Sequence, residues 1–327
     1  MNTNEDKPNN IPDNIAVSVK ELEKKFGDFT AVNKIDFEVH GGEIFGFLGP
    51  NGAGKSTTIR MLCGIIPPTS GSGQVGGYDI FREQHKIKEH IGYMSQKFSL
   101  YNDLSVEENI NFYSGIYKIP KAQKKERFNM VIRSAGLEGM ERTLTSTLAG
   151  GWKQRLALGC ALLHKPRIIF LDEPTSGVDP ITRANFWGVI KELAAGGVTV
   201  FVTTHYMDEA ENCDRMVLIY RGTIIATGTP QEMKTGYMKN EVIEIILPDS
   251  KNWLEKIGGI EGVKEAALFG SDIHAVVYDS SKAISAIKEF LEREKVEGVG
   301  VRKILPSLED VFVSSIEEYD QREPKKN

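Results

Sequence analysis

The nine residues GPNGAGKST, at positions 49–57, constrain the fold of this chain more tightly than any other segment. They match the pattern G-x-x-x-x-G-K-[ST], in which glycines let consecutive backbone N–H groups point at phosphate oxygens. The apolar run EIFGFLG (43–49) precedes them and the helical pattern GKSTTIRMLCG (54–64) overlaps and follows them. A glycine turn that merely joins strand to helix is the alternative, but all four fixed positions are present. The segment therefore predicts a phosphate-binding loop at the N-terminus of a helix, made of Gly49, Pro50, Asn51, Gly52, Ala53, Gly54, Lys55, Ser56 and Thr57.

A second apolar run, RIIFLDEP (167–174), contains two consecutive carboxylates. Asp172 ends the predicted buried strand, where a carboxylate can hold Mg²⁺ together with the hydroxyl of Ser56. Glu173 projects to a different side, toward an attacking water, as a general base would. Two carboxylates that only cap the turn before Pro174 are the alternative, and the phosphate loop upstream decides in favour of the metal and base roles.

Two more polar residues follow predicted strands. Gln96 comes directly after IGYMS (91–95), and its amide can contact Mg²⁺ or the water; a solvated loop glutamine is the alternative. His205 ends VTVFVTTH (198–205), at the carboxyl edge where ligands bind in open α/β sheets. A histidine there can hydrogen-bond the terminal phosphate.

The whole chain predicts an α/β domain followed by a smaller α+β domain. At 327 residues it is long enough for two domains, and its hydrophobic content of 40% is ordinary for a globular protein. Strands alternate with helices over residues 15–238, which predicts a mainly parallel sheet. Residues 239–316 contain the order β-α-β-β-α-β, which is ferredoxin-like. The polar ends, 1–14 and 317–327, are expected to be disordered.

Charge, cysteines and hydropathy exclude several classes of function. A net charge of −5 gives no general attraction to nucleic acid or to an anionic membrane. Cys63, Cys160 and Cys213 are far apart and form no C-x-x-C pair, which favours reduced thiols over a disulfide framework or a zinc site. No apolar run approaches the roughly 20 residues that span a bilayer. A cytoplasmic protein is expected.

Taken together, the motifs resemble a known family. GPNGAGKST, Gln96, LAGGWKQR (148–155), IIFLDEPTSGVDP (168–180) and VTTH (202–205), in this order and spacing, resemble the nucleotide-binding subunit of an ABC transporter over about residues 15–235. The resemblance implies a P-loop NTPase fold of the ABC type, with a RecA-like core, an antiparallel β subdomain and a helical subdomain at about 97–150. It also implies ATP as substrate, Mg²⁺ as cofactor and ATP hydrolysis as the reaction.

The family also gives a role to LAGGWKQR, whose glycine pair has no catalytic group beside it. The segment matches the signature motif, usually LSGGQ, which in the family clamps the terminal phosphate held by a second subunit. A homodimer or a paired homologue is therefore implied, with Ala149, Gly150 and Gly151 binding nucleotide. Asp179 matches the loop that crosses the same interface. Ala149 replaces the family serine and Trp152 the family glutamine, so a weaker clamp and modest turnover are expected.

Further resemblances concern the base and the partners. Phe26 matches the aromatic residue on which adenine stacks; core packing of Phe26 and a role for Phe29 are the alternatives. The segment LPSLEDVFV (305–313) is similar, over a short match, to the tail of drug- and antibiotic-export ATPases that pair with ABC-2 type permeases. The resemblance places docking of the permease beside KFSLYNDLS (97–105), where Phe98, Leu100 and Tyr101 could instead be buried.

The resulting hypothesis is an exporter ATPase. It would be peripheral on the inner face of the membrane, contact the membrane only through the permease, and bind no nucleic acid. A soluble ABC ATPase acting in translation or DNA repair, and a nucleotide-dependent regulator that hydrolyses weakly, are the competing hypotheses.

Overall fold

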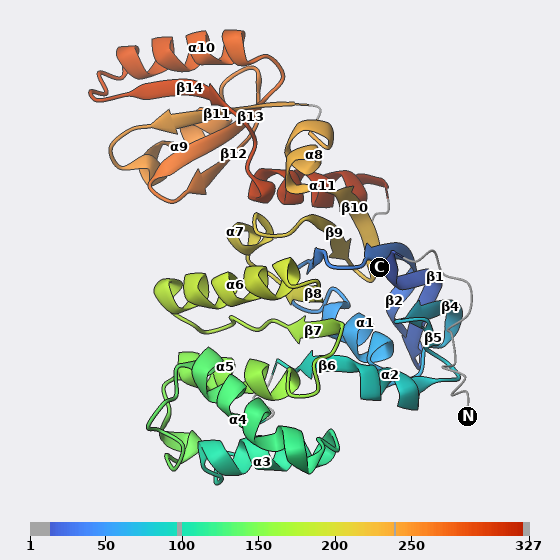
Figure 1. Cartoon of the computed structure of the whole chain (residues 1–327). Coiled ribbons are helices and arrows are strands. Elements are labelled where there is room, and N and C mark those ends of the chain that lie inside the picture. The colour runs from blue at the N-terminus through green and yellow to red at the C-terminus, as the bar shows by residue number, and fades with distance from the viewer. Residues whose placement is uncertain (1–13, 97–99, 239, 323–327) are drawn as a thin grey trace. The chain divides into compact units, whose positions relative to one another are not determined.

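The computed structural model describes residues 14–96, 100–238 and 240–322, which form two compact units, Met1–Thr229 and Pro230–Asn327 (Figure 1). The sequence placed the change of domain at residues 238/239. The boundary falls earlier because the helix α8 (Pro230–Gly236) packs against α11 (Leu308–Arg322), within the second unit. The expected disordered tail 1–14 lies almost wholly outside the described residues.

The first unit is built on a six-stranded sheet with the order β10-β9-β3-β8-β7-β6. Its strands are β3 (Ile44–Leu48), β6 (Ile91–Met94), β7 (Ile168–Asp172), β8 (Thr199–Thr204), β9 (Arg215–Tyr220) and β10 (Thr223–Gly228). All neighbouring pairs are parallel except the hairpin of β9 and β10. Every residue of β3, β7 and β8 is buried, as their continuous apolar runs predict.

An antiparallel sheet with the order β2-β1-β4-β5 packs beside this central sheet. Its strands are β1 (Ile15–Phe26), β2 (Phe29–His40), β4 (Ser70–Val75) and β5 (Tyr78–Asp79). The two sheets share one hydrophobic core, in which the ring of Phe37 from β2 lies 5.5 Å from Phe47 of β3 and 6.0 Å from Phe201 of β8. Such tilted aromatic pairs stabilise a core beyond the area that they bury.

Helices connect the strands of the first unit. They are α1 (Lys55–Leu62), α2 (Gln84–His90), α3 (Val106–Ile116), α4 (Lys121–Ala135), α5 (Gly150–Ala161), α6 (Pro180–Ala195) and α7 (Met207–Ala210), with a 3₁₀ turn at Thr145–Thr147. The helices α3, α4 and α5 pack on one another between β6 and β7 in sequence. Gly136 ends α4 with a φ of 65°, the left-handed conformation in which glycine commonly ends a helix. In the predicted permease-docking segment Leu100 is buried and Tyr101 is exposed, and Phe98 lies outside the described residues.

The second unit follows the predicted β-α-β-β-α-β order. Its elements are β11 (Glu241–Ile246), α9 (Ser250–Gly258), β12 (Val263–Phe269), β13 (Asp272–Val277), α10 (Ser280–Arg293) and β14 (Gly300–Ile304). The sheet order is β12-β13-β11-β14, with every pair antiparallel. Apolar residues of the strands, α9 and α10 form a core of their own. The unit is therefore an α+β domain with an independent core.

The end of the chain differs from the prediction. The sequence predicted a disordered tail from residue 317, whereas α11 continues to Arg322. An ion pair of 3.1 Å between Arg322 and Glu318, one turn apart, supports this last part of the helix. Asp310 of α11 also lies 3.3 Å from Nδ1 of the buried His274 in β13, which fixes α11 on this sheet.

Within the described part of the chain, no helix combines the length and the apolar character needed to cross a bilayer. The three cysteines are free and buried.

Candidate active site

The loop between β3 and α1 depends on two glycines at which a side chain has no room. A Cβ at Gly49 would lie 2.2 Å from the carbonyl oxygen of Ile219, and one at Gly54 would lie 2.6 Å from that of Ala31. Gly54 also has a φ of 112°, which side chains rarely adopt. Gly54 is the N-cap of α1, while Asn51 and Gly52 are exposed. The loop is thus held against the sheets with its tip open to solvent at a helix N-terminus.

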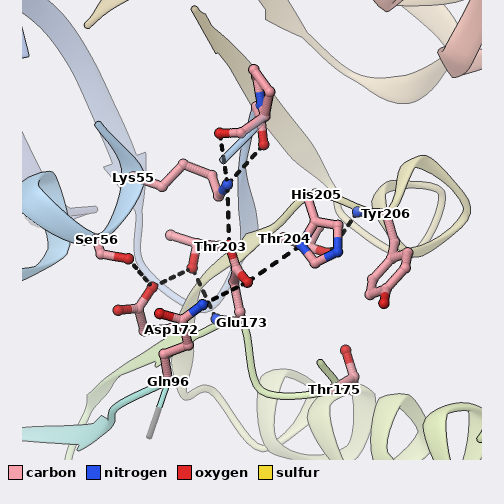
Figure 2. Close-up of polar contacts among 12 residues, drawn as sticks. Lys55, Ser56, Gln96, Asp172, Glu173, Thr175, Thr203, Thr204, His205 and Tyr206 are labelled. Carbon is pink, nitrogen blue, oxygen red and sulfur yellow. Dashed lines mark hydrogen bonds and ion pairs between the residues drawn. The ribbon is translucent and has the colours of Figure 1, made fainter. Parts of the chain in front are cut away.

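Lys55 lies below this loop and is almost fully buried. Its Nζ donates to the carbonyl oxygens of Gly49, at 2.7 Å, and Pro50, at 3.2 Å. The same Nζ lies 3.1 Å from Oε1 of Glu173, which is also buried (Figure 2). The Lys55 ammonium group is part of the predicted phosphate-binding loop. In this structure it is satisfied by two loop carbonyl oxygens and by the Glu173 carboxylate.

Asp172 lies at the carboxyl end of β7, and only one of its two carboxylate oxygens accepts hydrogen bonds from described residues. Its Oδ1 accepts hydrogen bonds from Ser56 Oγ, at 3.0 Å, and from Thr203 Oγ1, at 2.8 Å. Its Oδ2 is buried and has no hydrogen-bond partner among the described residues. Burial raises the pKa of Asp172 above its usual range, and the two hydroxyl donors oppose that shift.

This arrangement fits a divalent cation. Buried carboxylate oxygens are almost always partnered, and an oxygen-ligated cation such as Mg²⁺ would supply the missing partner of Oδ2. Ser56 presents its hydroxyl to the same carboxylate. Ser56 and Asp172 are therefore a suitable pair of oxygen donors, and the Mg²⁺ site that the sequence predicts stays a prediction.

Glu173 is the point at which the predicted catalytic residues meet. Its Oε2 accepts a hydrogen bond of 3.0 Å from Gln96 Nε2 and lies 3.3 Å from His205 Nδ1 (Figure 2). Three loops, after β3, β6 and β8, therefore converge on one carboxylate. The Glu173 backbone has a φ of 48°, and its N–H donates to the carbonyl and hydroxyl oxygens of Thr203 at 3.1 and 3.0 Å. A non-glycine residue in this conformation is costly and persists only where surrounding contacts fix it.

Thr203 is one functional residue that the sequence reasoning missed. Its single hydroxyl contacts both Asp172 and the backbone of Glu173. The signal was a pair of threonines at the end of the mostly apolar strand VTVFVTT, since buried hydroxyls need partners.

A second missed group centres on Glu209 of α7, which is 1% exposed. It accepts hydrogen bonds from Thr175, which follows β7, and from Thr204, at 2.6 Å, which precedes His205. Arg183 of α6 lies 3.4 Å from it. Glu209 therefore ties together the segments that carry Glu173 and His205, and no sequence spacing marked it.

The glycine pair of LAGGWKQR serves two different needs. Ala149 is the N-cap of α5, and its side chain makes no capping hydrogen bond. A Cβ at Gly150 would meet nothing within 4 Å, whereas one at Gly151 would lie 2.3 Å from Thr182 Cγ2 of α6. Gly151 is therefore required by packing within the chain, while Gly150 faces open space. No hydrogen bond or ion pair between described residues joins this helix start to the Lys55–Glu173 cluster.

Two other predicted residues lie at the surface. Asp179 caps α6 by accepting a 3.0 Å hydrogen bond from the Thr182 backbone N–H, and it is exposed. Phe26 and Phe29 are 51% and 64% exposed and face each other across the β1–β2 turn. Neither ring belongs to the core, so the core-packing alternative for Phe26 is wrong, and Lys24 Nζ lies 5.0 Å above the Phe26 ring.

Comparison with known proteins agrees with this geometry. The family model described as "ABC transporter" matches residues 32–176. The probable multidrug ABC transporter ATP-binding protein YbhF of Escherichia coli (strain K12) is 51% identical over 70% of this chain, but the matched region makes up only 40% of YbhF. Nod factor export ATP-binding protein I of Ralstonia nicotianae is 32% identical over 91% of this chain and 92% of its own length.

Among solved structures, a dimeric post-hydrolysis state of the ATP-binding cassette MJ0796, bound to ADP and Pi, matches with a TM-score of 0.60 and 26% identity. The match covers 65% of this chain and 98% of that one.

Proposed function

This chain belongs to the ATP-binding proteins of the ABC transporter family, and we propose that it hydrolyses ATP as one half of a head-to-tail dimer that drives export through a separate membrane permease. The observation that carries the proposal is the buried carboxylate of Glu173. It lies within 3.1 Å of Lys55 and within hydrogen-bond distance of Gln96. Phosphoryl transfer to water needs a positive group for the phosphates, here Lys55, close to a base for the water, here Glu173.

In the proposed mechanism ATP changes the partner of Lys55. The β- and γ-phosphates take the place of Glu173 and the loop carbonyls, while backbone N–H groups at the N-terminus of α1 hold the phosphate oxygens. Glu173 then no longer neutralises Lys55, and its carboxylate is available to accept a proton from the attacking water. Gln96 and His205, both beside Oε2, orient that water and the terminal phosphate.

We propose that Ser56 and Asp172, with Gln96, would hold Mg²⁺, which would neutralise charge on the phosphate oxygens. Thr203 fixes Asp172 Oδ1, and Oδ2, which has no hydrogen-bond partner among the described residues, would be available to the ion. Phe26, exposed at the end of β1, is proposed to stack on adenine, a contact of about 1–3 kcal/mol per base.

The position of the signature segment supports the proposed dimer. Among the described residues no hydrogen bond or ion pair joins the Ala149 or Gly150 side of α5 to the Lys55–Glu173 cluster of the same chain, and Gly150 faces open space. We therefore place Ala149, Gly150 and Gly151, with the positive end of α5, on the terminal phosphate of a second subunit. Asp179, exposed at the start of α6, lies in the loop proposed to cross the same interface. The related cassette MJ0796 is dimeric in its structure with ADP and Pi.

Export of a drug-like or lipid-like compound is proposed from the relatives. YbhF is named as a probable multidrug protein and the Ralstonia relative as a Nod factor exporter. The partner is proposed to be an ABC-2 type permease at the inner face of the cell membrane. The second unit is proposed to be a ferredoxin-like accessory domain, supported by its element order and fully antiparallel sheet.

The first test is phosphate release from ATP by the purified chain with Mg²⁺. We expect turnover in the wild type and its loss in Lys55→Ala, while Lys191→Ala, an exposed lysine on α6, retains it. Turnover that survives Lys55→Ala would contradict the proposed site. Bound ATP without turnover in the wild type would instead support the regulator hypothesis.

The second test separates the transporter from a soluble ATPase. The chain is expressed with the membrane proteins encoded beside it and purified in detergent. Co-purification of a polytopic permease is expected, and retention of ribosomes or DNA in its place would contradict the exporter proposal.

A further inference from the structure

A cavity of about 720 Å³ lies in the first unit, away from the Lys55–Glu173 cluster. It is lined by residues of α4, α5 and α6, by the segment 165–167 before β7, and by the turn 196–198 before β8. These segments precede strands β7 and β8, whereas Asp172, Glu173 and His205 follow them. The cavity therefore lies at the opposite ends of the same strands and is a separate site.

The cavity exists because α5 and α6 are in contact at their N-terminal ends and diverge toward their C-terminal ends. Gly151, at the start of α5, approaches Thr182 of α6 so closely that a Cβ would lie 2.3 Å from its Cγ2. Farther along α5, Gly159 packs on α4, since a Cβ there would lie 2.7 Å from Val131 Cγ1. The start of α5 therefore contacts α6, and its later part contacts α4. The three helices are labelled in Figure 1.

Parts of the facing stripes of the two helices line the cavity and do not pack against each other. On α5 and its C-cap the lining residues are Arg155, Leu158, Gly159 and Leu162, and on α6 and its C-cap they are Val189, Glu192, Leu193 and Gly196. Both sets have the spacing i, i+3, i+4, i+7 of a single helix face. Faces of this kind ordinarily bury their apolar side chains against each other. Here the apolar side chains line an open volume instead, within the range typical of pockets that bind small molecules.

The charges around this apolar volume are mostly positive. Arg155, Lys165 and Arg167 line it, against the single carboxylate of Glu192. Lys165 lies 3.6 Å from Glu126, but Arg155 and Arg167 have no acidic partner among the described residues. Arg155 and Arg167 therefore line the cavity as guanidinium groups without a counter-charge in the described part of the chain, and a bound anion would supply that counter-charge.

We propose that this cavity binds an anionic amphiphile, a molecule with an apolar chain or ring system and one carboxylate or phosphate head group. Arg155 and Arg167 bind the head group, because guanidinium groups pair well with planar or tetrahedral oxyanions. Leu158, Leu162 and Leu193 contact the apolar body. A neutral molecule of the same size supplies no counter-charge to Arg155 and Arg167 and binds more weakly.

Titration calorimetry of the purified full chain tests the proposal with three probes of one chain length, decanoate, decyl phosphate and 1-decanol. We expect one molecule of decanoate or decyl phosphate to bind per chain, and 1-decanol to bind at least about tenfold more weakly, equivalent to about 1.4 kcal/mol. The tighter of the two anions identifies a fatty acid or a phospholipid-like head group. Equal affinities for decanoate and 1-decanol would overturn the proposal.

Variants locate the site. Arg155→Gln, and Arg167→Gln as a second variant, should each lower the affinity for the anions about tenfold and leave 1-decanol unchanged. Arg133→Gln, an exposed arginine of α4 that does not line the cavity, is the matched control. Val189→Trp should fill the cavity and abolish binding of all three probes. Unchanged decanoate binding in Val189→Trp, or in both Arg155→Gln and Arg167→Gln, would overturn the proposal.

Discussion

Lys55 and Glu173 form a buried ion pair, with Nζ 3.1 Å from Oε1 and both side chains almost fully buried. The pair links the residue proposed to bind phosphate with the residue proposed to activate water. Each side chain is therefore paired with the other until a triphosphate binds. The Glu173 carboxylate also accepts a hydrogen bond from Gln96. A catalytic base held by the phosphate-binding lysine would not activate water before ATP is bound.

Glu173→Gln should separate binding from hydrolysis. The amide cannot accept a proton, so ATP turnover is expected to fall about 10²- to 10⁴-fold, the usual contribution of general-base catalysis. ATP affinity should be retained or increased, because Lys55 no longer has a competing carboxylate. Single-turnover phosphate release and nucleotide-binding measurements check the two parts.

The same variant tests the dimer. With hydrolysis blocked, Mg·ATP is expected to convert the chain to a dimer in analytical ultracentrifugation, and ADP is expected to leave it monomeric. Glu138→Gln, at an exposed position, is the control and should behave as wild type. A monomer at saturating Mg·ATP would contradict the proposed interface.

Asp172→Asn should stabilise the nucleotide-free chain while impairing its Mg²⁺ site. Burial raises the pKa of Asp172, so the ionised form destabilises the fold at pH values above that pKa. The amide keeps an oxygen for the Ser56 and Thr203 hydroxyls but carries no charge. The melting temperature is therefore expected to rise at pH 7, and the gain should shrink as the pH falls toward the ordinary aspartate pKa of about 4, because the wild-type carboxyl becomes progressively protonated.

The measurements are thermal unfolding across this pH range and Mg²⁺-dependent ATP binding, which should weaken at pH 7. Asp103→Asn, at an exposed loop position, serves as the control. A melting temperature at pH 7 that is unchanged or lower in Asp172→Asn would contradict the assigned cause of the pKa shift.

The sequence predicted those parts of the site that lie on regular strands. Asp172 ends an apolar run, Glu173 follows it directly, and His205 follows the mostly apolar strand VTVFVTT, so the carboxyl edge of one sheet could be inferred before any coordinates. Thr203 and Glu209 were missed because their roles depend on side chains from other elements, and no fixed spacing connects Glu209 to Thr175.

In the fold, too, the regular elements could be predicted from the sequence, whereas contacts between elements could not. The central sheet follows from the alternation of strands with helices and the antiparallel subdomain from the family resemblance, but the close approach of Gly151 to Thr182 depends on how two helices cross. That crossing also leaves the cavity beside α6, which no sequence pattern indicated. The last turns of α11 were missed because their polar composition is also typical of a disordered tail. The ion pair between Arg322 and Glu318 supports the helix there.

Gly150 and Gly151 should respond differently to the same change to alanine. Gly151→Ala places a methyl group against Thr182 Cγ2 and is expected to lower the free energy of unfolding by about 1–3 kcal/mol. Thr182→Ser removes that methyl partner and should restore much of the loss. Gly150→Ala meets no atom within 4 Å, so the chain should unfold as wild type does.

Function distinguishes the pair further. Because the Gly150 Cβ would project into the space assigned to the second subunit's nucleotide, Gly150→Ala should reduce ATP-dependent dimerisation despite normal stability. Denaturant unfolding and ultracentrifugation measure the two effects. Destabilisation by Gly150→Ala equal to that by Gly151→Ala would show that both glycines serve packing alone.

Phe26→Ala should weaken ATP binding by about 1–3 kcal/mol if its exposed ring stacks on adenine. The same change at Phe29, the more exposed ring, should have little effect, and neither should alter thermal stability because both rings lie outside the core. Equilibrium binding of ATP and of inorganic triphosphate provides the comparison, since only the former has a base to stack. A larger loss for Phe29→Ala would transfer the role to that ring.

Ala149 is the N-cap of α5 without a capping side chain, so substitutions there can separate helix stability from phosphate recognition. Ala149→Ser and Ala149→Asp should each cap α5 and raise the free energy of unfolding by about 0.5–2 kcal/mol. Their effects on the dimer should be opposite. The serine hydroxyl can donate to a phosphate oxygen and is expected to increase ATP-dependent dimerisation and turnover, while the aspartate carboxylate repels the phosphate and should decrease both. Thermal unfolding, ultracentrifugation and phosphate release are measured on all three proteins. If serine and aspartate raised turnover equally, the segment would act only by stabilising its own helix, and the proposed contact with the nucleotide of the partner subunit would be wrong.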